Sequence, residues 1–358
     1  MIVTTLCFMR LMGGLALLAF SGSALIAADL VASSQEIPDF SALIATKLVK
    51  PGKANPGALP GIHDWLFIYS DLRFLSHPQF WGADAAKVSQ APKPELADPL
   101  PAIIDFNRQL AARGIHLLVV PIPPKVTIYP EKLFPETPTT RRPSVPALAR
   151  FYEVLRGNSV DVLDLTSLFL ENRESEHGNV FCKTDSHWSG AGCALAAKEI
   201  SQRVRTYLDA QTTSKKYQSE WVEKSIDGDL AGLITTDASK RLTEKIQIRV
   251  VSEQGVTTGI QPDPQSPVLL LGDSHTLVFH DFLAERAGLL DQLSVELGSP
   301  PDLIGTRGSG ATPVRVSLYR RSLKDPEFLA KKKVVIWCFA AREFTEADQG
   351  WAKLPISK

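Results

Sequence analysis

The fold of this chain is decided by the stretch Val268-Leu269-Leu270-Leu271-Gly272-Asp273-Ser274-His275. Its four apolar residues lie between Pro267 and Gly272 and are typical of a buried strand. A helical pattern follows at once and runs from Thr276 to Leu290. Ser274 is therefore predicted to lie on a strand-to-helix turn, which lifts its hydroxyl off the sheet beside the free N–H groups of the helix start. A serine in this position is a candidate nucleophile.

A second polar motif precedes this serine in the chain and reads Asp185-Ser186-His187-Trp188. Asp185 and His187 are two residues apart in a predicted loop, so in an extended backbone their side chains point the same way. This arrangement suits a carboxylate that orients an imidazole, which in turn deprotonates a serine. The three side chains together predict nucleophilic acyl transfer. Taken singly, each motif also fits a capped turn or a surface hydrogen-bonding pair, and His275 is a second candidate base.

Helical and strand-like patterns alternate along most of the chain. The predicted helices are 101–113, 144–156, 191–207 (with Ser189 as its cap) and 313–330, and the predicted strands are 115–120, 160–165, 268–271 and 334–339. This alternation is typical of a parallel sheet covered by helices on both faces. Active sites in such sheets lie beyond the carboxyl ends of the strands, where both polar motifs fall. Residues 209–266 are polar and short-stranded and are predicted to be an irregular insertion.

Composition limits the class of protein. Of the 358 residues, 44% are hydrophobic and 22% charged, which is ordinary for a globular protein. The 39 Lys and Arg residues balance the 39 Asp and Glu residues, and no basic patch stands out, so nucleic acid is not expected as a partner. No Cys/His spacing resembles a zinc site, and we expect neither a metal nor a cofactor.

The N-terminus has the order of a secretory signal. Arg10 is followed by an apolar core, 11–20, and by small residues up to Ala28. The apolar run is borderline for crossing a bilayer, so residues 1–28 are predicted to be a signal peptide or an uncleaved signal anchor. Residues 29–60 suit a lead-in or tether, and residues 61–358 are predicted to form the main domain.

Three cysteines lie outside the signal. Cys182 and Cys193 flank the Asp-x-His motif closely, so a disulfide between them would form in an oxidising compartment, although ordinary core cysteines fit as well. Cys338 lies in a strongly apolar strand, which favours a buried free thiol.

The motifs resemble those of the SGNH-hydrolase-like proteins of bacterial exopolysaccharide O-acetylation, the alginate acetylation group of the AlgJ and AlgX type. In this group the Asp-His pair precedes the serine, whereas ordinary SGNH esterases carry the serine first. The resemblance implies an SGNH-like three-layer α/β/α sandwich with a mainly parallel sheet and a permuted motif order. It is carried by Trp65-Leu66-Phe67, 120–125, 183–188, Gly228-Asp229-Leu230, 271–274, 307–311 and 335–342.

The resemblance implies a triad of Ser274, His187 and Asp185, an acetyl-serine intermediate, and acetyl transfer to a hydroxyl of a periplasmic polysaccharide. The acetyl donor would be a membrane-bound O-acyltransferase, within an exopolysaccharide biosynthesis complex. AlgX-like proteins carry a carbohydrate-binding domain after the catalytic one, and this chain ends soon after Arg342, so the AlgJ type is the closer match. Two alternatives stay open: a secreted carbohydrate acetylesterase with the same triad, and a non-catalytic polysaccharide-binding scaffold.

Several further residues are candidates for the site. The expected oxyanion donors are the Ser274 N–H and an N–H from the loop Gly308–Gly310, although such a loop is commonly only a turn. Trp188 either shapes the acceptor site or stacks on a sugar ring, or it simply packs in the core. Arg342 and Lys125 follow strands, so each either reaches the site or is an exposed cation at a strand end.

Overall fold

The structure is a computed structural model that describes residues 40–49, 56–138, 142–208, 215–256 and 258–357. The signal predicted for 1–28 lies outside the described residues. Contacts divide the chain into two units, Met1–Gln35 and Glu36–Lys358, and the description below concerns the second unit. In the part of the chain that the structure describes, no helix is long and apolar enough to cross a membrane.

A five-stranded parallel sheet forms the centre of the domain, with strand order β10-β9-β11-β3-β4. Its strands are β3 (His116–Ile122), β4 (Asp161–Val162), β9 (Val268–Gly272), β10 (Asp302–Gly305) and β11 (Val334–Ala340). All residues of β9 and β11 are buried, which explains why these strands are continuous apolar runs. Because the pairing is in parallel register, the carboxyl ends of β9, β11 and β3 lie side by side.

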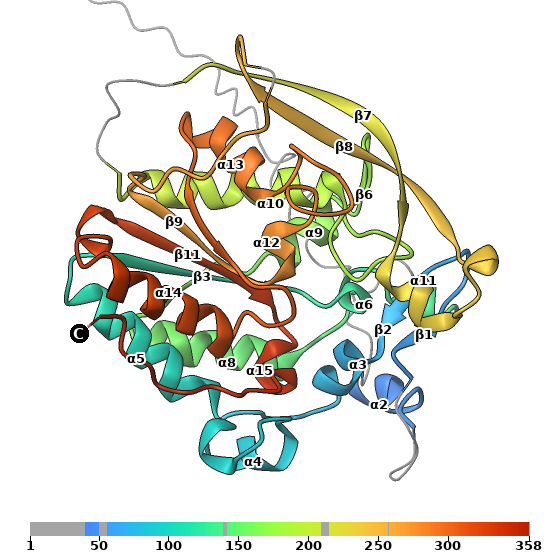
Figure 1. Ribbon diagram of the computed structural model, residues 1–358. Coiled ribbons are helices and arrows are strands. Elements are labelled where there is room, and N and C mark those ends of the chain that lie inside the picture. Colours follow the sequence, from blue (N-terminus) through green and yellow to red (C-terminus); the bar gives the residue numbers. More distant parts are fainter. Residues whose placement is uncertain (1–39, 50–55, 139–141, 209–214, 257, 358) are drawn as a thin grey trace, which may run out of the picture. The chain divides into compact units, whose positions relative to one another are not determined.

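Helices cover both faces of this sheet (Figure 1). One face carries α5 (Pro99–Ala111), α8 (Pro146–Gly157) and α14 (Thr312–Lys324), and the other carries α10 (Gly190–Arg205) and α13 (Leu289–Leu297). The predicted three-layer α/β/α architecture is confirmed. The predicted cap of α10 is also present, because the Ser189 side chain accepts a hydrogen bond from the Gly192 N–H at 3.2 Å.

The predicted irregular insertion contains a long hairpin instead of short strands. Strands β7 (Tyr217–Asp227) and β8 (Thr243–Glu253) pair antiparallel along their full length, and helix α11 (Asp229–Ile234) lies in the connection between them. β8 packs on α10 and α13 through Ile246, Ile248 and Val251, which are buried. Only one side of the ribbon is covered, and that is why its sequence is mostly polar.

The helix predicted from Thr276 to Leu290 is interrupted. Helix α12 covers only Ser274–Leu277, and Phe279 then adopts a left-handed backbone with φ 63°. This conformation is uncommon for a bulky residue and ends the helix. The chain doubles back so closely that a Cβ on Gly288 would lie 2.7 Å from the Val278 carbonyl oxygen, and the helix resumes only at α13.

Parts of the predicted lead-in belong to the folded domain. Helix α2 (Phe40–Ala45) buries Phe40 and Ile44 in the main core, and β1 (Ala58–Pro60) pairs antiparallel with β2 (Leu66–Ile68). The remaining short elements are α3 (Tyr69–Leu75), η1 (Gly82–Asp84), α4 (Ala85–Val88), η2 (Pro94–Leu96), α6 (Lys125–Ile128), α7 (Pro130–Leu133), α9 (Thr166–Glu171), β5 (Glu174–Ser175), β6 (Gly178–Asn179), η3 (Ala238–Lys240), η4 (Leu329–Lys331) and α15 (Glu343–Glu346).

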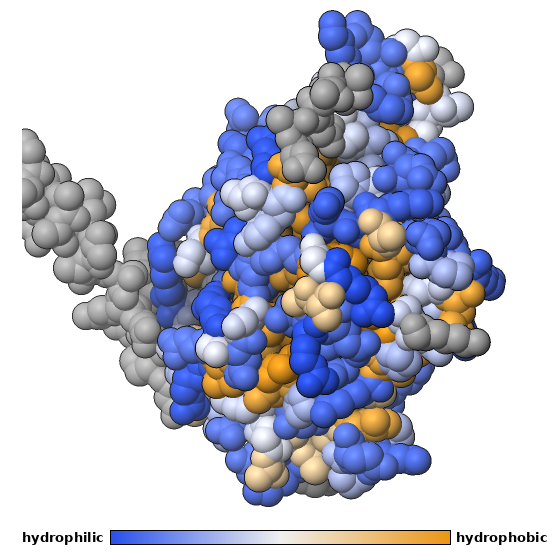
Figure 2. Space-filling model, turned by 90° about the vertical axis from the view of Figure 1, so that its left-hand side faces the viewer, coloured by the Kyte–Doolittle hydropathy of each residue, from blue (hydrophilic) through white to orange (hydrophobic). Residues whose placement is uncertain are grey.

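The face at the amino ends of the central strands is mostly hydrophilic, with hydrophobic residues in small groups between polar ones (Figure 2). Such scattered apolar exposure is normal for a folded domain. Both polar motifs lie at the opposite, carboxyl end of the sheet.

Candidate active site

The turn that carries Ser274 is fixed by the neighbouring strand. Asp273 caps α12 by accepting a hydrogen bond from the His275 N–H at 2.9 Å, and its second oxygen accepts one from the Ala340 N–H at 2.8 Å. Gly272 is required, because a Cβ there would lie 2.0 Å from the Cys338 carbonyl oxygen. As the first helical residue, Ser274 has an N–H without an acceptor inside the helix.

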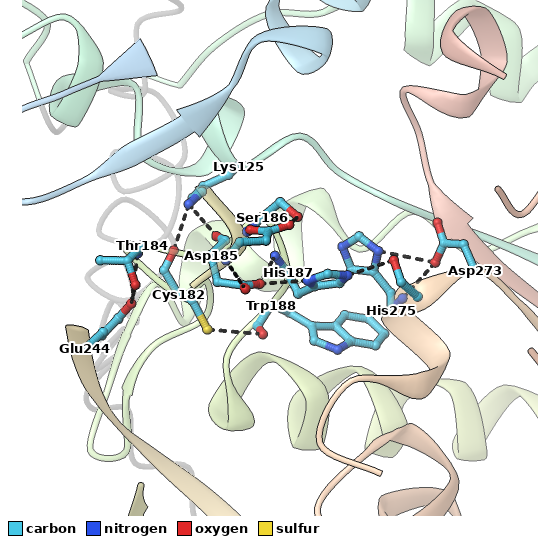
Figure 3. A network of polar contacts seen from close by, with 12 residues as sticks. Lys125, Cys182, Thr184, Asp185, Ser186, His187, Trp188, Glu244, Asp273 and His275 are labelled. Atoms are coloured by element: carbon cyan, nitrogen blue, oxygen red, sulfur yellow. Dashed lines mark hydrogen bonds and ion pairs between the residues drawn. The ribbon is translucent and has the colours of Figure 1, made fainter. Parts of the chain in front are cut away.

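Three predicted site residues, Ser274, His187 and Asp185, form one hydrogen-bonded line, and Figure 3 labels the last two. Ser274 Oγ lies 2.7 Å from His187 Nε2, and His187 Nδ1 lies 2.7 Å from Asp185 Oδ1. The same carboxylate oxygen accepts a hydrogen bond from the His187 backbone N–H at 2.9 Å. The imidazole is therefore held from both sides, with one ring nitrogen facing the serine hydroxyl.

The acid and the imidazole shift each other's pKa. Burial acts to raise the pKa of Asp185, but the hydrogen bond and charge of His187 hold it well below the usual range. Burial acts to lower the pKa of His187, but the hydrogen bond and charge of Asp185 raise it above its ordinary value. The pair thus favours a charged carboxylate and stabilises the imidazolium, as a general base requires when it takes a proton.

The second histidine has a different role. His275 is buried, its Nδ1 lies 3.2 Å from Asp273 Oδ1, and burial lowers its pKa to about 4. It is therefore neutral near pH 7, and the contact with Ser274 belongs to His187. Trp188 packs edge-on against His275 with the ring centroids 5.6 Å apart, and it is fully buried. Trp188 therefore packs in the core, and its buried ring offers no exposed face on which a sugar could stack.

Lys125 is a positioning residue rather than an exposed cation. Its ammonium is buried and donates hydrogen bonds to the backbone carbonyls of Cys182 at 2.8 Å and Asp185 at 2.7 Å (Figure 3). The side chain lies near the rings of Trp65 and Phe67, and burial lowers its pKa. Sequence reasoning placed Lys125 at the correct strand end but missed this contact. The only sequence feature that pointed to this residue was its position directly after Pro123-Pro124 at the end of a strand.

The β7–β8 hairpin also holds the loop that carries Asp185 and His187, the acid–base loop. Asp229 donates its backbone N–H to Asp185 Oδ2 at 2.9 Å and accepts hydrogen bonds from the backbone N–H and the hydroxyl of Ser186. Glu244 of β8 accepts one from the Thr184 N–H at 2.9 Å. Asp185, His187 and Asp229 are close enough to hold a metal ion, but all four oxygens of the two Asp carboxylates already accept hydrogen bonds.

The predicted oxyanion loop is only partly beside the serine. Gly310 is buried against the turn that carries Ser274, because a Cβ there would lie 3.2 Å from Asp273 Cβ and 2.4 Å from Phe339 Cβ. Gly308 is exposed, with φ 106°. Between them, the Ser309 hydroxyl donates to Glu343 Oε2 at 2.6 Å. Gly310 is thus the member of the loop that remains a candidate donor.

Arg342 contacts Asp71 rather than the triad residues, and its charge acts on Asp273. Its side chain is only 15% exposed, and Nη1 lies 3.3 Å from Asp71 Oδ1. Burial acts to raise the pKa of Asp273, but His275 and, to a smaller extent, the Ala340 N–H and Arg342 lower it to about 2. The interpretation of Arg342 as an exposed cation at a strand end was wrong.

The cysteines do not form the disulfide considered for this loop. Cys182 and Cys193 are both free and buried, and the Cys182 thiol lies 3.5 Å from the Trp188 carbonyl oxygen. Hydrogen bonds and packing hold the loop without a covalent link. The prediction of a buried free thiol at Cys338 is confirmed.

The chain matches a known protein family over most of its length. Residues 59–341 match the model of the family described as "SGNH hydrolase-like domain, acetyltransferase AlgX". The chain belongs to this family. Its predicted relationship to the AlgX and AlgJ group is confirmed.

Two relatives and one solved structure define the similarity. "Probable alginate O-acetylase AlgJ" of Azotobacter vinelandii is 23% identical over 316 residues, which cover 84% of this chain and 74% of that protein. The Pseudomonas fluorescens protein of the same name is 26% identical over 321 residues, covering 85% and 74%. The O-acetyltransferase domain of Pseudomonas putida AlgJ matches with a TM-score of 0.60 and 22% identity, over 81% of this chain and 93% of that structure. The family's SGNH-like fold is thereby confirmed.

Proposed function

We propose that this chain is an O-acetyltransferase that carries an acetyl group on Ser274 and passes it to a hydroxyl of an exported polysaccharide, alginate or another exopolysaccharide. The observation that carries the proposal is the hydrogen-bonded line from Ser274 Oγ through His187 to Asp185 at the carboxyl end of the sheet. Family membership and the names of the AlgJ relatives support the acetyl group and the polysaccharide.

In the first step, Ser274 Oγ attacks the carbonyl carbon of an acetyl donor while His187 Nε2 takes the hydroxyl proton. The bond from the acyl carbon to the donor's leaving group then breaks, and His187 returns the proton to that group. Asp185 holds the imidazole in place and stabilises its charged form. The N–H groups of Ser274 and Gly310 are the proposed donors to the oxyanion.

In the second step, a sugar hydroxyl replaces the leaving group. It attacks the acetyl-serine, its proton passes to His187 Nε2, and the ester bond to Ser274 Oγ breaks as the serine recovers a proton. We place this reaction in the periplasm, with an N-terminal segment that is either cleaved or retained as an anchor, and with a membrane-bound O-acyltransferase of an exopolysaccharide assembly as the acetyl donor.

The test is mass spectrometry of the protein incubated with an activated acetyl ester, with and without oligosaccharides, with Ser274→Ala as the matched control. An acetyl adduct on Ser274 that is then passed to sugar is the expected result. Release of the acetyl group only to water would instead make the protein an esterase with the same triad. No adduct on Ser274 would overturn the proposal and favour a non-catalytic polysaccharide-binding subunit.

A further inference from the structure

A cavity lies beside the predicted oxyanion loop, Gly308–Gly310. It has a volume of about 350 Å³ and is lined by Arg307, Ser309, Glu343, Glu346, Asp348 and Gln349, among others. This volume is within the range of small-ligand sites. Since Ser309 and Glu343 bond to each other and Gly310 packs on Asp273, only one loop separates the cavity from the turn that carries Ser274.

Glu343 gives this cavity a buried polar wall. The residue is 5% exposed, and its Oε2 accepts the Ser309 hydroxyl at 2.6 Å. Its other oxygen, Oε1, has no hydrogen-bond partner among the described residues, although it is not enclosed by protein. Burying more than nine-tenths of a carboxyl group costs free energy when one of its oxygens has no hydrogen-bond partner, unless a ligand or water supplies that partner.

The charges of the lining distinguish between sugars. Arg307 is paired with Asp281 at 2.9 Å, and Glu346 is paired with Arg73 at 2.9 Å. Asp348 is exposed and has no ion-pair partner in the described part of the chain. The lining therefore holds three acidic side chains and one cation, Arg307, which already has a carboxylate partner. This excess of acids suits hydroxyls that both donate and accept, and it disfavours a carboxylate.

We propose that this cavity binds a neutral sugar unit of the acceptor polysaccharide, beside the unit whose hydroxyl reacts, with the Glu343 carboxyl as its hydrogen-bonding wall. This inference rests on the proposed acetyl transfer to a polysaccharide, and it narrows the acceptor. A chain built only of uronates would bring a carboxylate against Asp348 and Glu343 at this position.

The protonation state of Glu343 adds a pH dependence. Burial and the charge of Asp273 raise its pKa to about 7, against the opposing effects of the Ser309 hydrogen bond and Arg342, and Asp348 adds to the rise. Below about pH 7 the carboxyl both donates and accepts hydrogen bonds, whereas above it the carboxylate only accepts. Binding of a uronate should therefore weaken as the pH rises, because ionised Glu343 repels the carboxylate of the sugar.

The experiment measures binding by calorimetry to the full chain carrying Ser274→Ala, at pH about 6 and about 8. The probes are a β-1,4-linked glucose hexasaccharide and a β-1,4-linked mannuronate hexasaccharide. We expect the neutral probe to bind about tenfold more tightly than the uronate at the higher pH. Asp348→Asn and Glu343→Gln should each strengthen uronate binding several-fold, and Glu343→Gln should remove the pH dependence of uronate binding.

Asp348→Asn is the safer variant, because the residue is exposed, and Glu327→Gln at an exposed position is the matched control and should change nothing. Equal or tighter binding of the uronate, absence of binding by both probes, or insensitivity to both variants would overturn the inference. Acetylation of the Ser274 enzyme is measured in parallel. If acetyl-Ser274 forms but the binding prediction fails, only the inference falls. If sugar binds as expected and no adduct forms, the proposed acetyl transfer falls instead.

Discussion

The turn that carries Ser274 and the loop that carries Asp185 and His187 are held in place in different ways. The turn directly follows β9 and is fixed by its neighbour β11 through the contacts of Gly272 and Asp273. The acid–base loop is held by groups that are distant in sequence, namely Lys125 and the β7–β8 hairpin. The position of Ser274 therefore depends on the sheet itself, whereas the position of His187 depends on contacts that can be removed without changing the sheet.

Asp185→Asn should have the largest effect on the comparison, because it disables the proposed base while Lys125 and Glu244 keep their contacts with the loop. We expect acetylation of Ser274 to slow by about 10⁴-fold, since the amide neither orients the imidazole correctly nor stabilises its charge. The measurement is the rate of adduct formation by mass spectrometry. Unchanged thermal unfolding would show that the loss is chemical, and a loss below tenfold would contradict the assigned role.

Lys125→Met should separate the two regions most clearly. It leaves the carbonyls of Cys182 and Asp185 buried without their donor, so we expect a loss of about 2–4 kcal/mol in stability and a ~10–100-fold slower acetylation. Denaturant unfolding and adduct formation measure the two effects. The exposed Lys198→Met is the matched control. Wild-type acetylation in a folded Lys125→Met protein would show that the loop does not need this support.

The pH dependence of acetylation should report the raised pKa of His187. Below that pKa the imidazole is protonated and cannot act as a base, so the rate should fall about tenfold per pH unit on the acid side, from a midpoint above the ordinary value for histidine. In Asp185→Asn the midpoint of the acid limb should move to lower pH, because burial then lowers the pKa of His187 against only the charges of Asp229 and Asp273. An acid limb at the same pH in both proteins would exclude this coupling.

Glu244→Ala tests the hairpin's share of the support. It removes the acceptor for the Thr184 N–H, one residue from Asp185, while Lys125 and Asp229 remain in place. We expect acetylation to slow by only about three- to tenfold. The exposed Glu220→Ala on β7 serves as the control in the same assay. Equal effects of the two variants would indicate that the hairpin contributes nothing specific through this contact.

A reducing agent should have no effect on the thermal stability of the protein. Cys182 and Cys193 are free thiols, so no covalent closure stabilises the acid–base loop. The midpoint of thermal unfolding should be the same with and without a reductant. A drop on reduction would reveal a disulfide and change the account of how the loop is held.

The sequence was sufficient wherever a feature is local. The apolar run of β9, the turn at Ser274 and the cap Ser189 are each specified by a few neighbouring residues, and the structure has them where they were predicted. The Asp185–His187 spacing is local too, and only its meeting with Ser274 required the fold.

Features that depend on distant partners were missed. The helical pattern after Ser274 gave no sign that Phe279 turns back toward Gly288, because the reason is a close approach across the loop. The burial of Lys125 and Arg342 depends on acceptors contributed by other segments, whereas an isolated cation at a strand end is most commonly exposed. The pairing of β7 with β8 was missed for a similar reason. Most residues of β7 are polar, so its sequence lacks the alternation of apolar and polar residues that identifies a strand.

The burial of Lys125 also has a practical use. Acetyl esters modify lysine amines that reach solvent, and in the folded protein the Lys125 amine is enclosed and occupied by backbone carbonyls. Its peptide should stay unmodified in native molecules and become acetylated in denatured ones. The acetylated fraction of the Lys125 peptide, read from the same mass spectrum as acetyl-Ser274, therefore measures how much of the protein was unfolded when the reagent was added.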